Sequence, residues 1–309
     1  MTIVFSHPAC MEHNMGEGHP ERPARLNAVE QALQKEGIGN KLDRREPEKA
    51  KLSSVELMHP PKYVEKILNS VPSSGITRLD ADTCLSPGSV EAALRAVGAA
   101  CSAVDAVTCG EAKNAFCAVR PPGHHAETNT AMGFCIFNTV AIAAAYAREK
   151  YGFQRLAVVD FDVHHGNGTQ EMFWSDRDLF FASTHQMPLY PGTGSRNEKG
   201  DFDNILNCPL RAGDGSSEFR SAVSEVILPG LIAFQPELLF VSAGFDAHAL
   251  DPLAGLNLQD SDYGWVTTKL MEIADKSTNG RLISALEGGY DLAALSSSVA
   301  SHVEELVKA

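Results

Sequence analysis

Acidic and histidine side chains alternate where an apolar run of the sequence ends. Asp160, Asp162 and His164 follow the apolar residues 156–159. Side chains two apart on a strand point to the same face, so these three can lie together. Carboxylates and imidazoles are ligands of transition metals. Parallel α/β folds place their ligand sites beyond the carboxyl ends of strands. The spacing therefore favours a metal site over a polar strand end with capping residues.

A second apolar run, residues 238–241, leads to another acid, Asp246. Alone, Asp246 would be interpreted as a cap or turn residue. Beside Asp162 and His164 it is the predicted third ligand. Three protein ligands leave one position open for water and substrate, as in catalytic metal sites. Zinc suits this set of nitrogen and oxygen donors, and Fe²⁺ or Co²⁺ would also be accepted.

Two adjacent histidines, His124 and His125, follow a Pro-Pro-Gly turn. Hydrolysis at a metal site needs a base for the water and an acid for the leaving group, which two imidazoles can supply. Asp160 is spaced to orient one of these rings. Tyr290 follows the glycines that end the last apolar run, and its hydroxyl could polarise a carbonyl group opposite the metal.

The elements that must position these residues alternate along the chain. Such alternation predicts βαβ units, a parallel sheet, and strands covered on both faces. Strands are expected at 3–5, 114–119, 156–159, 179–182, 238–241 and 282–286, and helices at 23–36, 87–107, 138–150, 217–234 and 263–276. Polar loops follow these strands at 120–133, 162–169, 184–200, 244–255 and 287–291, so one site built from many loops is expected at one end of the sheet. The charged segment 41–51 is interpreted as a solvated connection.

Composition limits the class of protein. The chain has 309 residues, is 44% hydrophobic and carries a net charge of −13. That length allows a large core, and the charge argues against a nucleic-acid groove. The seven cysteines include no CxxC pair, which favours free buried thiols in a reducing cytoplasm. The N-terminus is interpreted as a first strand rather than a signal peptide, and no apolar run is long enough for a membrane span.

The chain resembles the histone deacetylase superfamily of the arginase–deacetylase fold. The resemblance is strongest to the class II-like bacterial members called histone deacetylase-like amidohydrolases. Its motifs extend over nearly the whole chain in family order: 19–23 (HPERP), 120–125 (RPPGHH), 133–135 (GFC), 160–169 (DFDVHHGNGT), 190–194 (YPGTG), 244–248 (GFDAH) and 287–290 (EGGY). The resemblance implies one domain over residues 1–309, built as a three-layer α/β/α sandwich around a mostly parallel sheet.

The resemblance also implies roles for individual residues. One zinc ion would be held by Asp162, His164 and Asp246, with His124 and His125 as general acid and base and Tyr290 as oxyanion donor. An apolar tunnel for the alkyl stem of an acylated amine would be lined by Gly133, Phe134, Tyr190 and Leu253. Arg22 would line an internal channel for acetate. A structural K⁺ would be held by Asp160, Asp162, His164, Ser183 and Thr184, and a second one by carbonyl groups near Phe173, Asp176 and Leu179.

Asn167 departs from the class I members, which carry an aspartate there. An amide can orient His125 but cannot neutralise an imidazolium, so we expect the pKa of His125 to be less elevated than that of His124. Asn167 is nevertheless the class II pattern. Tyr290 is retained, whereas some class II members carry histidine and deacetylate poorly.

The expected activity is removal of acetyl or short acyl groups from the side-chain amine of acyl-lysine in a protein or peptide. An acetylpolyamine amidohydrolase remains open, because Asp80, Asp82, Glu17 or Glu127 could supply the acidic rim that such enzymes use, although Leu253 is apolar. An arginase-like enzyme would need a further acid where Gly166 stands, and another in place of His248. A non-catalytic acetyl-lysine binding module would tolerate loss of a ligand or of Tyr290, yet all are present. The sequence leaves a homo-oligomer open.

Overall fold

One parallel sheet organises the chain. The computed structural model describes residues 1–35 and 37–309. Eight strands lie in the order β2-β1-β5-β10-β9-β6-β7-β8, and each neighbouring pair is parallel. Their bounds are β1 Thr2–Phe5, β2 Leu42–Arg45, β5 Asn114–Cys117, β6 Leu156–Asp160, β7 Leu179–Gln186, β8 Ile205–Leu210, β9 Leu238–Ala243 and β10 Leu282–Leu286. A separate antiparallel pair consists of β3 Thr77–Arg78 and β4 Cys84–Leu85.

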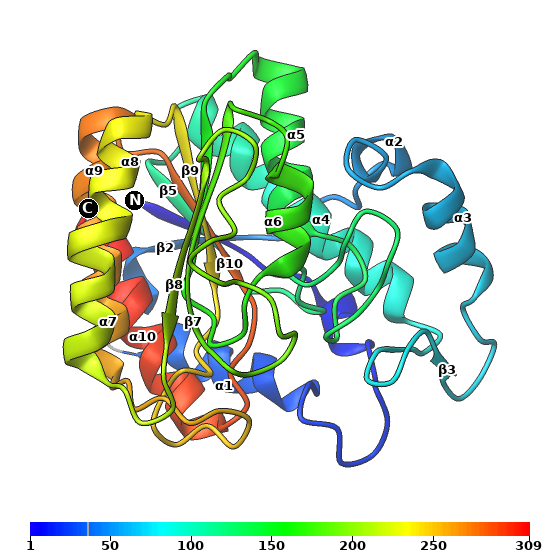
Figure 1. Cartoon of the computed structure of the whole chain (residues 1–309). Coiled ribbons are helices and arrows are strands. Elements are labelled where there is room, and N and C mark those ends of the chain that lie inside the picture. The colour runs from blue at the N-terminus through cyan, green and yellow to red at the C-terminus, as the bar shows by residue number, and fades with distance from the viewer. Residues whose placement is uncertain (36) are drawn as a thin grey trace.

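Helices cover both faces of the sheet, which gives the expected three layers (Figure 1). One layer contains α1 Ala24–Leu33, α7 Ser216–Ala222, α8 Leu228–Phe234, α9 Asp260–Ser277 and α10 Leu292–Lys308. The other contains α4 Ser89–Thr108, α5 Thr139–Tyr151 and α6 Asn167–Phe173. The short helices are α2 Leu52–Val55, α3 Pro61–Asn69, η1 Pro8–Met11, η2 Gly39–Lys41 and the π-helical η3 Val223–Ile227.

The central strands are buried along their whole length because both faces are covered, and most of their residues are apolar. Every residue of β5, β6, β9 and β10 is buried. A strand buried on both faces needs no alternation of polar and apolar residues, which explains the continuous apolar runs in the sequence. Among the described residues no helix is long and apolar enough to cross a membrane. The seven cysteines are free, and Cys109 alone is exposed.

Several boundaries differ from the predicted ones. The segment 41–51 is not all connection, because Leu42–Arg45 forms the edge strand β2 beside β1. The predicted helix 217–234 consists of α7, η3 and α8 in succession. The predicted helix 23–36 ends at Leu33, and its last residue, Glu36, lies outside the described residues.

Two predicted loops contain regular structure. Residues 184–186, assigned to a loop, continue strand β7. Residues 167–169, assigned to another loop, begin helix α6. Strand β8 and helices α3 and α10 were not predicted from the sequence.

The order of the strands decides where the site lies. Strands β5, β10, β9 and β6 are neighbours in the middle of the sheet. All four run in the same direction, so the segments that follow them meet at one edge. These are the segments that carry the two histidines, the three predicted ligands and Tyr290.

Candidate active site

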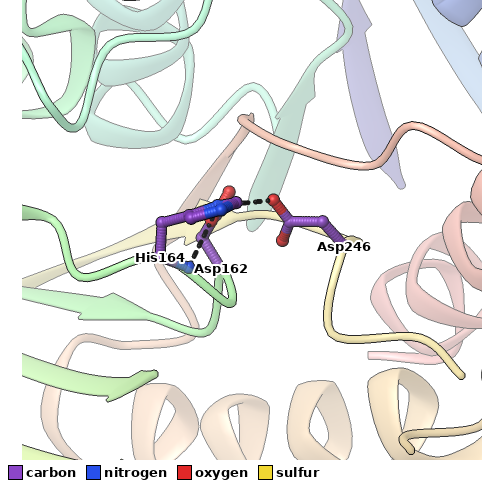
Figure 2. A group of neighbouring side chains, drawn as sticks. All are labelled: Asp162, His164 and Asp246. Atoms are coloured by element: carbon purple, nitrogen blue, oxygen red, sulfur yellow. Dashed lines mark hydrogen bonds and ion pairs between the residues drawn. The ribbon is translucent and has the colours of Figure 1, made fainter. Parts of the chain in front are cut away.

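The three predicted metal ligands meet beyond the ends of β6 and β9 (Figure 2). Nδ1 of His164 lies 3.2 Å from Oδ1 of Asp162 and 3.1 Å from Oδ2 of Asp246. Both carboxylates are buried, with exposed fractions of 1% for Asp162 and 0% for Asp246. Two buried carboxylates require a cation, because burial of unpaired charge is costly.

The environment of this cluster fits a bound metal ion. Although burial opposes it, the hydrogen bonds to Asp162 and Asp246 raise the pKa of His164 to about 10, which shows how strongly the two carboxylates favour positive charge at this position. The backbone N–H groups of Val163 and Gly288 donate to Asp246 Oδ1 and Asp162 Oδ2, at 2.9 and 2.8 Å. These hydrogen bonds fix the carboxylates in the way expected of groups that orient metal ligands.

A close turn after β10 completes the cluster. A Cβ atom on Gly288 would lie 2.1 Å from Oδ2 of Asp246 and 2.6 Å from Oδ2 of Asp162. Only glycine therefore permits this backbone to pass so close to both carboxylates.

The two histidines lie beside the cluster and are held by different partners. Nδ1 of His124 donates to Oδ2 of Asp160 at 2.9 Å, and Nδ1 of His125 donates to Oδ1 of Asn167 at 2.7 Å. The amide of Asn167 is fixed in turn, because its Nδ2 donates to Glu127 at 2.7 Å. Each ring is therefore protonated at Nδ1 and directs Nε2 elsewhere.

The pKa values of the two histidines move in opposite directions. Burial disfavours the charged form of both rings. For His124 the carboxylates of Asp162 and Asp160 outweigh burial and hold its pKa well above the usual range. For His125, burial and then the nearby His124 hold the pKa well below that range. The expected order of the two pKa values is confirmed, and His125 is not elevated at all.

Glu287 was not singled out from the sequence as a functional residue. Its Oε2 accepts from the backbone N–H groups of Gly123 and His124 at 2.6 and 3.2 Å, and its Oε1 accepts from Ser242 at 3.2 Å. Burial raises the pKa of Glu287 to about 7. This side chain joins the end of β10 to the turn that carries the histidines. Its position in the EGGY motif was the available signal.

An apolar cavity of about 240 Å³ leads to this chemistry. All four predicted tunnel residues line it, together with His125, His164 and Tyr290. The complete lining is Asp82, His125, Gly133, Phe134, His164, Leu189, Tyr190, Leu253 and Tyr290. The rings of Phe134 and Tyr290 pack edge to face, with their centroids 5.9 Å apart. The rings of Tyr190 and His125 pack in the same way, with their centroids 5.1 Å apart.

Gly133 lets the cavity wall pass close to His125. The residue has a φ of +56°, and a Cβ atom there would lie 2.4 Å from Cδ2 of the imidazole. The turn therefore requires glycine for both conformation and space.

Tyr290 is held through its backbone by an acid that sequence reasoning missed. Oδ2 of Asp251 accepts from the N–H of Tyr290 at 2.7 Å, while Oδ1 accepts from the N–H of Leu253 at 3.0 Å. One carboxylate thus connects the backbone of the tunnel residue Leu253 to the backbone of Tyr290. Burial, and then the charge of Asp246, raise the pKa of Asp251 to about 7.

The prediction for Arg22 is corrected. Arg22 is exposed, which contradicts a place in an internal channel. The buried arginine is Arg25, which donates to the carbonyl oxygens of Gly289 at 2.6 Å and Glu287 at 2.5 Å. Its guanidinium lies 4.9 Å from the ring centre of Tyr290. The available signal for Arg25 was its position on the apolar face of α1, one helical turn before the buried residues Ala28 and Val29.

The residues predicted to hold monovalent cations lie in two places. Asp160 and Ser183 are register partners on β6 and β7, beside the segment that carries Asp162 and His164. The carbonyl groups of Phe173, Asp176 and Leu179 do converge, but on the side chain of Asn204.

Residues 19–306 match the family model of the histone deacetylase domain. The chain therefore belongs to the histone deacetylase family. It is 36% identical over 293 residues to the histone deacetylase-like amidohydrolase of Pseudomonas aeruginosa, covering 94% of this chain and 77% of that protein. It is 39% identical over 295 residues to a probable deacetylase of Archaeoglobus fulgidus, covering 94% and 81%.

A solved structure, the HD domain of HDA15, superposes with a TM-score of 0.94 at 32% identity. The alignment covers 99% of this chain and 88% of that one. Family and fold together indicate an enzyme, a hydrolase that acts on amides, rather than a binding module.

Proposed function

We propose that the protein is a zinc-dependent amidohydrolase that removes acetyl or short acyl groups from the side-chain amine of acyl-lysine. The observation that carries this proposal is the apolar cavity lined by His164, which belongs to the cluster of Asp162, His164 and Asp246. A cavity of this kind suits an alkyl stem with a polar group at its end. Zn²⁺, when bound by these residues, supplies a Lewis acid for the amide carbonyl and for water.

The proposed roles of the two histidines follow from their hydrogen bonds. His125 lines the cavity and is protonated at Nδ1, so its Nε2 can accept the proton of the attacking water. The same Nε2 then returns that proton to the departing amine nitrogen. His124, held by Asp160, remains protonated and favours negative charge developing nearby. The Tyr290 hydroxyl donates to the oxyanion of the tetrahedral intermediate.

The metal proposal predicts one transition-metal ion per chain. Asp246→Ala should lose the metal and the activity together, because the remaining carboxylate and imidazole cannot complete the site. Elemental analysis of the purified protein measures the stoichiometry. Two tightly bound transition metals per chain would refute the assignment.

The tunnel proposal is tested with a hydroxamate that bears an aromatic cap. A chelating head on a slender stem should reach the ligands through the cavity and inhibit at low concentration. If the zinc-loaded enzyme is not inhibited, Phe134 and Tyr190 do not form the expected walls.

An acetylpolyamine is the second candidate substrate, and Asp82 favours it. This carboxylate lines the cavity, with Oδ1 accepting from the N–H of Gly133 at 3.1 Å. Its other oxygen could accept a peptide N–H of an acyl-lysine substrate or pair with the second ammonium of a polyamine. An exposed pair of that kind is worth about 1 kcal/mol at most.

A substrate panel separates the two candidates. The measurement is kcat/KM for an acetyl-lysine peptide, acetylputrescine and acetylspermidine, in the native enzyme and in Asp82→Asn. We expect the peptide to be preferred. If kcat/KM for either polyamine is tenfold higher than for the peptide, and Asp82→Asn abolishes this advantage, then the substrate is an acetylpolyamine and not acyl-lysine.

We also propose a cytoplasmic location, and free thiols at all seven cysteines support it. Fractionation of the native cells tests this location.

A further inference from the structure

Three backbone carbonyl groups converge on one side-chain atom between α6, β7 and β8. Nδ2 of Asn204 lies 2.9 Å from the carbonyl oxygen of Phe173, 3.1 Å from that of Asp176 and 2.7 Å from that of Leu179. Phe173 is the last residue of α6, and Leu179 is the first of β7. Asn204 precedes β8 and is 4% exposed. We call this group of three carbonyls the carbonyl cradle.

These are the carbonyl groups for which the family resemblance implied a second K⁺. Buried carbonyl oxygens need a positive partner, which an ion or an N–H group can supply. An ion bound to all three oxygens would have to occupy the position that Nδ2 holds. The donor in this chain is a neutral amide with two N–H groups.

We propose that the amide of Asn204 closes the carbonyl cradle and that the cradle takes no monovalent cation. This inference is independent of the proposed function. It leaves the Asp160 and Ser183 region as the place for a monovalent ion. The enzyme should then bind monovalent cations at one kind of site instead of two.

Asn204 also ties together elements that support His125. Its carbonyl oxygen accepts from the N–H of Phe181 in β7 at 3.0 Å, while its side chain holds the end of α6. Asn167, which orients His125, is the first residue of α6. A side chain thus fixes this helix to the sheet without an ion that could dissociate.

The orientation of the amide distinguishes closure from ion binding. Oδ1 of Asn204 is buried and has no hydrogen-bond partner among the described residues. A reversed amide would direct Oδ1 at three carbonyl oxygens, which only a cation between them would make tolerable. With Nδ2 inward, its two N–H groups are shared among the three carbonyl oxygens at the expense of one amide oxygen, while backbone N–H groups of Asp176 and Leu179 also donate to the carbonyls of Phe173 and Asp176.

Crystals grown in RbCl test the proposal, because Rb⁺ replaces K⁺ and is located by its anomalous scattering. The proteins are the native full chain and Asn204→Ala, with Asn207→Ala as the matched control. Asn207 lies on β8, and its Nδ2 donates to Gln170 and Glu198 outside the cradle. We expect no Rb⁺ in the cradle of the native protein or of Asn207→Ala, and Rb⁺ among the three carbonyls in Asn204→Ala.

Rb⁺ in the cradle of the native protein would overturn the proposal. An Asn204→Ala cradle that also stays free of Rb⁺ would overturn the statement that the amide is the barrier. Thermal unfolding supplies a second readout. The midpoint of Asn204→Ala should rise more steeply with KCl than the native midpoint, against N-methylglucamine chloride at equal ionic strength, because a ligand of the folded state stabilises it. Equal KCl dependence of the two proteins would contradict closure by Asn204.

Discussion

His124 and His125 are adjacent in the chain and yet face different partners. Asp160 offers His124 a full negative charge, whereas Asn167 offers His125 only a dipole. A carboxylate favours the imidazolium form and an amide oxygen does so weakly. Two identical side chains therefore differ in the direction of their pKa shifts, which suits His125 to accept and return a proton and His124 to stay charged in the proposed reaction.

Replacement of Tyr290 by phenylalanine should lower kcat by about a hundredfold or more. Loss of one oxyanion donor costs roughly 3 kcal/mol in the transition state. Metal content should be unchanged, because the ligands and their backbone donors are intact. Steady-state kinetics with metal analysis checks this prediction. Turnover close to that of the native enzyme would mean that the hydroxyl is not at the reacting carbonyl.

Asp251 should position Tyr290 without touching substrate. Its carboxylate accepts N–H groups on both oxygens, from Leu253 and from Tyr290. An asparagine retains one acceptor and presents N–H to the other donor, so Asp251→Asn should cost about 1–3 kcal/mol in hydrogen bonding. We expect kcat to fall about tenfold with metal content retained.

Asp214→Asn is the control for this variant. Asp214 also accepts a backbone N–H, that of Arg211 at 2.7 Å, in the turn after β8. It should leave kcat unchanged. If Asp251→Asn raises KM alone, Asp251 acts on the tunnel wall through Leu253 and not on Tyr290.

At the scale of elements, the turn after β10 should control metal affinity. Gly288→Ala would place Cβ against both Asp246 and Asp162, forcing one carboxylate to move. Disturbing groups that support metal ligands typically costs 10–100-fold in affinity. We therefore expect weaker zinc binding by about tenfold or more, measured by competition with a chelator.

Gly215→Ala provides the comparison. A Cβ atom at Gly215 would lie 3.4 Å from the nearest atom, an ordinary contact, at the start of α7. Its zinc affinity should match that of the native protein. Native affinity in Gly288→Ala would show that the turn can move away from the carboxylates without loss.

At the scale of the whole molecule, buried neutral histidines should make the fold sensitive to acid. Burial lowers the pKa of His59 and His185 to about 4 and that of His302 to about 3. Each ring has one nitrogen that donates and one that accepts. In His302 the hydroxyl of Thr267 accepts from Nδ1, because it donates to Tyr263, and Nε2 accepts from Ser284.

These pKa values determine the sign of the pH dependence. In the unfolded chain a histidine takes up a proton below about pH 6.5, whereas the buried rings stay neutral to about pH 4 or 3. For these three groups the unfolded state therefore binds more protons in this window, so their contribution to stability falls as pH falls below about 6.5. Asp251 and Glu287, whose pKa values burial raises to about 7, contribute with the opposite sign. Each such histidine contributes roughly 1.4 kcal/mol per pH unit.

Replacing His302 by glutamine should reduce the number of protons taken up on unfolding by about one. Glutamine keeps one donor and one acceptor but does not titrate. Denaturant unfolding between pH 7 and pH 5 measures the slope for the native protein and for His302→Gln. An unchanged slope in the variant would mean that His302 is protonated in the folded state.

The pattern of apolar runs in the sequence was sufficient to predict the central strands of the fold. The runs at β5, β6, β9 and β10 were visible because strands covered on both faces are mostly apolar. The edge strand β2 was missed because its Asp43, Arg44 and Arg45 resemble a solvated loop. Edge strands tolerate charge, which discourages pairing with other chains. Local sequence cannot distinguish such a strand from a connection.

The sequence by itself determined the chemistry available at the site. Asp162 and His164 are close because they are two residues apart, and His124 and His125 are close because they are adjacent. Only the tertiary structure decided which residues from distant segments join them. It placed Arg25 inside and Arg22 outside, brought Asp251 to Tyr290, and put Asn204 into the carbonyl cradle. These choices depend on helix rotation and strand order, which are set by burial of the whole core and not by any local spacing.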